Sequence, residues 1–262
     1  MKLSISNISW GCEQDNKIYQ MMKNKGYTGL EIAPTRIFVD KPYEKTRRAK
    51  LWAIELKKQY GLVISSMQSI WYGRTEKLFG SREERQALLN YTQKAINFAE
   101  AIGCRNLVFG CPVNRNLPQG VEDGIAVDFF RELGEYAAAH GTVIGMEANP
   151  PIYHTNYVNN TSAALELIRQ VDSRGFMLNL DVGTMIYNGE DVSKIAGNVQ
   201  LINHVHISEP WLNPIEERKL HLELKKVLTE EGYEGFVSIE MGRAQELTVI
   251  EKSLDYIGRV FQ

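Results

Sequence analysis

An alternation of short β-rich segments with longer amphipathic segments runs the length of this chain and constrains its fold more than any other feature. Strands are expected at 2–10, 28–34, 62–70, 104–112, 142–149, 176–183, 202–208 and 235–241. Helices are expected at 13–25, 45–60, 83–102, 123–140, 161–171, 190–198, 219–231 and 246–260. Most of the helical segments end at a glycine just before the next strand, where a helix C-terminus favours glycine.

The order of these segments predicts how the strands pair. Strands joined by helical crossovers run parallel, and eight right-handed β-then-α units are the number that closes a barrel. We therefore predict an α/β chain with a single (β/α)8 TIM barrel domain over residues 1–262. An open doubly wound sheet is the alternative, but the first strand-to-helix turn, Trp10-Gly11-Cys12-Glu13, lacks a G-x-G-x-x-G phosphate loop.

Composition narrows the possible partners and location. The formal net charge of −2 provides no basic field for a nucleic-acid backbone. The three cysteines have no metal-ligand spacing and are expected to be reduced thiols of a cytoplasmic protein. The first strand lacks the continuous apolar run of a signal peptide, and no window has the roughly 20 apolar residues of a membrane span. We expect binding to neither nucleic acid nor membranes.

An ionisable residue interrupts the apolar run of each of the last four predicted strands. These residues are Glu147, Asp181, His206 and Glu240. Buried carboxylates are costly unless they are paired or bind a metal, and active sites of such barrels lie at the C-terminal ends of the strands. The pattern therefore predicts one metal site made by these four residues.

The ligand types indicate which ion would bind. Three carboxylates and one imidazole suit Mn²⁺, Mg²⁺ or Co²⁺ and accept Zn²⁺, whereas structural zinc sites favour thiolates. An ion with five or six coordination positions would keep some open for a vicinal diol or hydroxyketone. We therefore expect one divalent ion as cofactor and a small polyol or sugar as substrate.

Four motifs around these residues resemble those of the xylose-isomerase-like TIM barrel superfamily, the sugar phosphate isomerase/epimerase family. They are E-A-N-P-P, L-D-V-G-T, H-V-H-I-S-E-P and S-I-E-M, and the resemblance covers essentially the whole chain. It implies that Glu147, Asp181, His206 and Glu240 hold the metal and that Glu147 and Glu240 also act as acid and base. It also makes a homo-oligomer an expectation.

The chain differs from two branches of this superfamily in the positions of its histidines. Ketose 3-epimerases and hydroxypyruvate isomerases commonly have a substrate-binding histidine three residues after the aspartate, where this chain has Thr184. Apurinic-site endonucleases of the superfamily use three zinc ions and several early histidines, but the first histidine here is His140. The pattern therefore favours a site with a single metal ion.

Further polar and aromatic residues fall near the predicted strand ends. His204 precedes His206 by two positions, and we expect only His206 to point into the barrel. Trp71 could stack on a sugar face, and His154 lies on the loop after Glu147. The predicted substrate-binding residues are Glu31, Gln68, Trp71, Asn149, His154 and Glu209.

These features predict a metal-dependent isomerase or epimerase of a small keto-sugar or related polyol. The ion would act as a Lewis acid and stabilise an enediolate, while one glutamate removes the proton beside the carbonyl and the other returns it. Two alternatives are a metal-dependent dehydratase or lyase of a cyclic keto-polyol, of the inosose or dehydroshikimate type, and a non-catalytic sugar-binding barrel. Fold alone does not choose among them.

Overall fold

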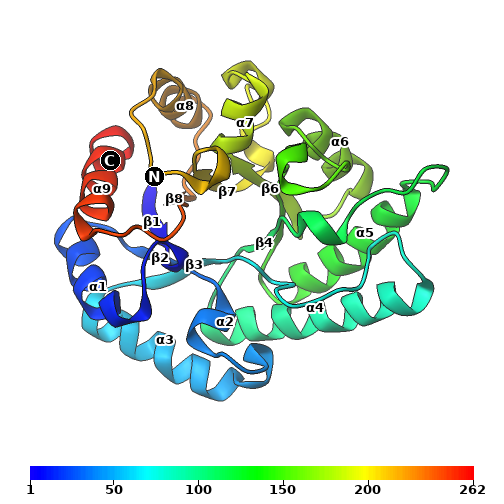
Figure 1. Ribbon diagram of the computed structural model, residues 1–262, viewed down its shortest axis with the longest axis horizontal. Coiled ribbons are helices and arrows are strands. Elements are labelled where there is room, and N and C mark those ends of the chain that lie inside the picture. The colour runs from blue at the N-terminus through cyan, green and yellow to red at the C-terminus, as the bar shows by residue number, and fades with distance from the viewer.

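The computed structural model describes residues 1–262 as one closed barrel of eight parallel strands, each hydrogen-bonded to the next (Figure 1). β1 pairs with β8 from Lys2↔Phe236 to Ile5↔Ile239, which closes the ring. The strands are β1 Lys2–Ser6, β2 Gly29–Ile32, β3 Val63–Met67, β4 Leu107–Phe109, β5 Ile144–Met146, β6 Phe176–Asp181, β7 Ile202–Ile207 and β8 Phe236–Ile239. The predicted fold class is confirmed.

Helices surround the barrel (Figure 1). The last helix, beside the first, covers the seam between β8 and β1, and Lys25 forms an ion pair with Asp255 across this contact. None of the helices combines the length and apolarity needed to cross a bilayer. The helices are α1 Asp15–Asn24, α2 Pro34–Ile37, α3 Thr46–Tyr60, α4 Arg82–Ile102, α5 Gly124–Ala139, α6 Thr161–Val171, α7 Val182–Asn188, α8 Lys219–Glu230 and α9 Leu247–Phe261.

The prediction of a helix at 190–198 was wrong. α7 instead begins directly after β6, because the Asp181 carboxylate accepts a hydrogen bond from the Thr184 amide and caps the helix N-terminus. Gly189, with φ of 66°, ends the helix. The predicted segment contains only the short 3-10 turn Val192–Lys194.

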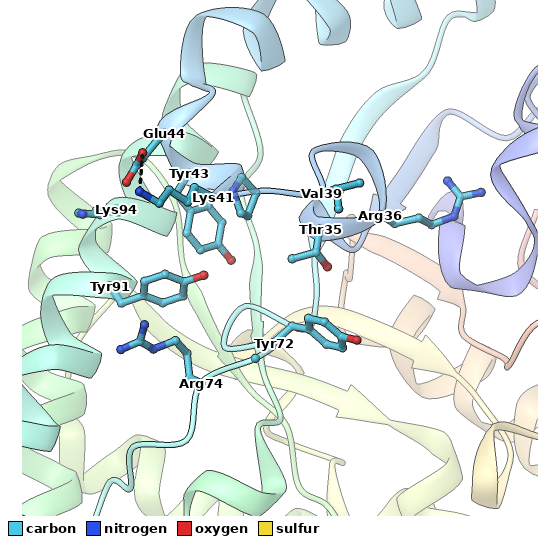
Figure 2. A pocket seen from close by; sticks show the side chains of 12 residues that line it. Thr35, Arg36, Val39, Lys41, Tyr43, Glu44, Tyr72, Arg74, Tyr91 and Lys94 are labelled. Atoms are coloured by element: carbon cyan, nitrogen blue, oxygen red, sulfur yellow. Dashed lines mark ion pairs between the residues drawn. The ribbon is translucent and has the colours of Figure 1, made fainter.

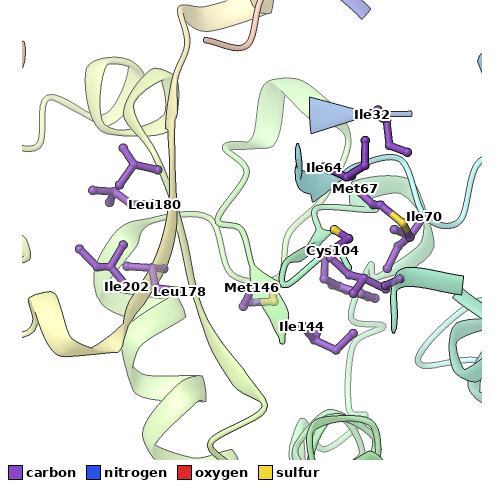
Figure 3. Packing of buried hydrophobic residues seen from close by; sticks show 14 of the residues in the cluster. Ile32, Ile64, Met67, Ile70, Cys104, Ile144, Met146, Leu178, Leu180 and Ile202 are labelled. Carbon is purple, nitrogen blue, oxygen red and sulfur yellow. The ribbon is translucent and has the colours of Figure 1, made fainter. Parts of the chain in front are cut away.

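The interior of the barrel is polar, and the apolar core lies outside it. On β6, Leu178 and Leu180 belong to the buried apolar cluster (Figure 3), and they alternate with Asn179 and Asp181. Successive strand residues point to opposite faces, so the alternation directs the polar pair into the barrel. Inside, Asn106 donates to the Ser66 hydroxyl at 2.9 Å. The barrel thus carries polar groups where Val, Ile and Leu usually dominate.

The backbone of α5 packs closely against the residue that precedes β6, and this contact can be tested. A Cβ at Gly175 would lie 1.9 Å from the carbonyl oxygen of Gly134 in α5, whereas a Cβ at Gly124 would have no neighbour within 4 Å. We expect Gly175→Ala to lower the free energy of unfolding by about 3 kcal/mol or more, since neither backbone can yield cheaply. Urea denaturation should find Gly124→Ala close to wild type. Equal stability of the two variants would contradict this packing.

Candidate metal and active site

Four side chains from consecutive strands converge at the C-terminal end of the barrel. One potential ligand atom from each of Glu147, Asp181, His206 and Glu240 lies within 4.8 Å of the others. His206 Nδ1 is 2.9 Å from Glu147 Oε1 and 3.2 Å from Glu240 Oε2. Metal–ligand bonds of roughly 2.0–2.2 Å place adjacent ligand atoms roughly 3 Å apart. The geometry and the chemistry of these donors therefore fit one divalent ion.

The imidazole of His206 is held from its other side by a carboxylate. His206 Nε2 lies 2.7 Å from Glu31 Oε2, and both side chains have no exposed surface. Gln68 donates to the other Glu31 oxygen at 3.1 Å and also hydrogen-bonds to Ser6. With a proton on Nε2, His206 turns a free Nδ1 lone pair toward the other three ligands, which is how carboxylate–histidine pairs orient metal ligands.

The amide of Asn149 holds Glu147. Asn149 Nδ2 donates to Glu147 Oε2 at 3.0 Å, while its Oδ1 accepts from the fully buried Arg115 at 2.8 Å. Asn179 donates to the other Glu147 oxygen at 2.9 Å. A Cβ at Gly110 would lie 2.8 Å from Glu147 Oε2, so a side chain at this position would displace the carboxylate. The carboxylate of Glu147 is thus fixed by two amides.

Burial shifts the proton affinity of two of the carboxylates. Burial raises the pKa of Glu240 to about 7, and the charge of Glu147 adds to this effect. Burial, followed by the charge of Glu147, raises the pKa of Asp181 to about 6. Three carboxylates gathered in so small a volume repel one another, and a cation relieves that repulsion.

The pKa values of His206 and of its other carboxylate partner, Glu31, shift in the directions that favour the charged forms. Burial by itself would lower the pKa of His206, but the carboxylates of Glu31 and Glu240 outweigh it and raise that pKa well above its usual range. For Glu31, burial would raise the pKa, yet the facing imidazoles of His206 and His204 hold it below its usual range. Metal binding would therefore replace a proton on His206 Nδ1.

The expectation that only one of the two histidines on β7 faces inward was wrong. His204 and His206 are both buried, and His204 Nε2 lies 3.2 Å from Glu31 Oε2. Residues two apart on a strand share a face, so both imidazoles point into the barrel. Glu31, His204 and His206 form a second group able to hold a metal. All three side chains are buried, and of the three only His204 lines a pocket, which has a volume of 610 Å³ and lies at the N-terminal ends of the strands, away from the face where barrel active sites form.

Three of the four residues, Glu147, Asp181 and Glu240, line a small open pocket, and His206 lies buried beneath it. The pocket has a volume of 140 Å³, and its wall also includes Asn149, Tyr153, Ser208, Glu209 and Leu212. Ser208 donates a hydrogen bond to Asp181. Sequence reasoning missed Ser208, Asn179 and Tyr153. The period of two could have found the first two, since Ser208 follows His206 by two residues and Asn179 precedes Asp181 by two.

Of the six predicted substrate-binding residues, two line the pocket and two lie in the barrel interior. Asn149 and Glu209 line the pocket, but the Glu209 oxygens accept from Arg218 at 2.6 and 2.7 Å. Glu31 and Gln68 lie in the barrel interior and contact each other, and Glu31 also contacts His206.

Trp71 and His154 lie outside that pocket wall. Trp71 is buried, donates to the Thr92 hydroxyl at 2.7 Å and packs edge-on against Phe109. His154 is exposed on its loop, with φ of 63°. Substrate contact by any of the six residues stays a prediction.

A larger cavity lies elsewhere and has different chemistry. It has a volume of 620 Å³ and is bordered by α2, the 3-10 turn Pro42–Glu44, the loop after β3 and α4 (Figure 2). The only carboxylate in its lining, Glu44, is paired with Lys41 at 3.9 Å. No cluster of metal ligands lies there, so the four-residue group is the candidate functional site.

A closed (β/α)8 barrel with a carboxylate–histidine group at its C-terminal end defines the class of protein, and comparisons define the family. The family model described as "Xylose isomerase-like TIM barrel" matches residues 20–260. The chain belongs to this family. None of the curated proteins matches it significantly.

Solved structures share this fold at low sequence identity. A 3-keto-D-glucoside 4-epimerase from E. coli has a TM-score of 0.76 at 20% identity, with 98% of each chain covered. D-psicose 3-epimerase from Clostridium cellulolyticum H10, crystallised with D-tagatose, has a TM-score of 0.75 at 15% identity, with 100% of each chain covered. An AP endonuclease, family 2, from Brucella melitensis has a TM-score of 0.74 at 20% identity, with 99% of each chain covered.

The pKa values predict how metal binding depends on pH. Asp181, with a pKa of about 6, and Glu240, with a pKa of about 7, must lose protons to bind a cation. Affinity for Mn²⁺ should therefore increase from about pH 5.5 to about pH 7.5 and continue to rise above it, because His206, whose pKa lies well above its usual range, must also lose a proton on binding. Calorimetric titration in buffers of different ionisation enthalpy measures both effects. An affinity independent of pH over this range would contradict the assigned ligands.

The two histidines provide a test of which group holds the ion. His206→Ala removes the only nitrogen ligand and should greatly weaken Mn²⁺ binding. His204→Ala should leave the affinity within a few-fold of wild type, because His204 is not in the four-residue group. Metal analysis after dialysis reports the result. Equal loss in both variants would instead place the ion between Glu31, His204 and His206.

Proposed function

We propose that this protein is a divalent-metal-dependent isomerase or epimerase of a small keto-sugar or related polyol. The observation that carries the proposal is the convergence of three carboxylates and one imidazole beside an open pocket. The ligand atoms suit Mn²⁺, Mg²⁺, Co²⁺ or Zn²⁺. When bound, such an ion would polarise a ketone and an adjacent hydroxyl and so lower the pKa of the intervening C–H group.

Glu147 and Glu240 are the proposed proton carriers. They reach the pocket from β5 and β8, on well-separated sides of the barrel, and flank His206 Nδ1. One would remove the proton beside the carbonyl and the other would return it, and return to the opposite face of the sugar carbon produces an epimer. Burial raises the pKa of Glu240 to about 7 in the absence of a cation, and a bound cation would lower that pKa and favour the ionised form that can remove a proton.

The names of structurally similar proteins support a sugar substrate without specifying it. Besides the two epimerases above, an L-ribulose 3-epimerase has a TM-score of 0.72 at 15% identity. At such identities the likeness concerns the fold, and the function is argued from the site itself.

One observation keeps a dehydratase or lyase as the second candidate. Thr184 occupies the position where 3-epimerases and hydroxypyruvate isomerases commonly have a substrate-binding histidine, and its hydroxyl donates to the Ala148 carbonyl at 2.8 Å. No imidazole reaches the pocket from this position. A dehydratase would use the same proton removal and then expel a β-hydroxyl, so a product that has lost water would identify it.

Proton exchange separates catalysis from binding. The Mn²⁺-loaded protein should incorporate deuterium from D2O beside the carbonyl of at least one substrate in a panel of ketoses, ketose phosphates and cyclic keto-polyols. Glu240→Gln should slow this exchange by roughly 10²–10⁴-fold, because the amide cannot carry the proton. Proton NMR measures the rate.

A matched control is Glu234→Gln, an exposed residue at the opposite end of β8 that should exchange at the wild-type rate. Wild-type exchange in a metal-loaded Glu240→Gln variant would make Glu240 a ligand only. No exchange by the wild-type protein with any of these compounds would favour the non-catalytic sugar-binding barrel.

A further inference from the structure

Exposed apolar side chains gather on the face of the barrel that holds the site. Five of the eight large exposed apolar residues lie on segments that follow the C-terminal ends of strands. The most exposed tryptophan, Trp211, has 63% of its surface accessible. Exposed apolar residues that touch one another mark binding sites, whereas residues scattered singly are ordinary. The five residues are Val39, Tyr72, Val113, Tyr187 and Trp211.

Two of these residues form an aromatic pair. Trp211 lies on the 3-10 turn Pro210–Leu212 after β7, and Tyr187 lies on α7 after β6. Their ring centroids are 6.1 Å apart with an interplanar angle of 79°. The two rings meet edge to face, and both residues remain exposed, so the pair offers aromatic ring surface to solvent.

The pair adjoins the pocket of the metal-binding group. The Trp211 amide donates to the Tyr153 hydroxyl at 2.8 Å, and Tyr153 lines the pocket. The next residue, Leu212, also lines the pocket. One turn of chain therefore places a leucine in the pocket wall and a tryptophan on its rim.

The backbone of this turn is held in an unfavourable conformation. Trp211 and Leu212 have φ of 60° and 55°, a region that non-glycine residues rarely occupy. The Leu212 amide donates to Glu209, and its carbonyl accepts from the Gly242 amide at 2.8 Å. Such strain persists only where surrounding structure enforces it, and it clusters at functional sites. Here it fixes an exposed indole beside the pocket.

The volume of the pocket indicates what would reach this pair. At 140 Å³ it is well below the roughly 300–1,000 Å³ of most ligand pockets. It can enclose little more than the sugar unit that contacts the metal ligands. Any group attached to that sugar unit must extend out of the pocket past its rim.

We propose that Trp211 and Tyr187 form a subsite for a second ring attached to the keto-sugar, so that the substrate is a keto-disaccharide or another ring-bearing keto-glycoside. This inference rests on the proposed function of the neighbouring site. The apolar C–H face of a sugar ring, or an aromatic aglycone, packs on an indole face with little loss of conformational freedom. A free monosaccharide would leave the pair uncovered.

The test compares ketoses with and without a second ring. The probes are D-fructose and two glycosylated fructoses, lactulose and isomaltulose, titrated calorimetrically into the Mn²⁺-loaded full-length protein. At least one disaccharide should bind about tenfold more tightly than D-fructose. Trp211→Ala should lower disaccharide affinity by roughly 3–10-fold, the effect of one aromatic contact, and leave D-fructose binding and metal content unchanged. Leu222→Ala, another exposed apolar residue, on α8, is the matched control.

Several outcomes would overturn the subsite. Disaccharides that bind no better than D-fructose would do so, as would a Trp211→Ala variant that weakens both equally. A change of Trp211→Ala from dimer to monomer in light scattering would assign this face to a second copy of the chain. Failure of the metal-loaded wild-type protein to bind any of the three sugars would count against the proposed function itself, and the subsite would fall with it.

Discussion

The site depends on one buried interaction, the contact between Glu31 and His206 inside the barrel. The two side chains are fully enclosed and 2.7 Å apart, so neither charge is solvated by water and each requires the other. Because Glu31 takes one ring nitrogen, the other faces the carboxylates of Glu147 and Glu240. Glu31, which does not line the pocket, therefore fixes the orientation of the His206 imidazole.

This arrangement requires a polar barrel interior, and the fold supplies it through the alternation of strand residues. Leucines on β6 face the surrounding helices, while Asn179 and Asp181 face inward. Parallel strands bring their C-terminal ends to one face, so four ligands distant in sequence meet there. The free energy of folding comes mainly from the apolar layer outside the barrel. The interior is consequently free to hold groups that an apolar core would exclude.

Sequence periodicity predicted the closed barrel and grouped the four candidate ligands, because both follow from local alternation repeated eight times. The periodicity did not predict α7, because the hydrogen bond that the Thr184 amide donates to Asp181 begins a helix where the strand pattern continues in the sequence. The inward position of His204 was predictable from the spacing of two but was assigned wrongly. The two hydrogen bonds that link Arg115 to Asn149 and Asn149 to Glu147 could not be predicted. They join segments that come into contact only when the barrel closes.

The central claim is that one ion sits among Glu147, Asp181, His206 and Glu240, with His206 binding through Nδ1. A crystal structure of the Mn²⁺-loaded protein, with anomalous scattering to locate the ion, tests it most directly. The account predicts one peak at roughly 2.0–2.3 Å from His206 Nδ1 and from an oxygen of each carboxylate, with Glu31 still on Nε2. A peak between Glu31, His204 and His206, or none at the pocket, would contradict it.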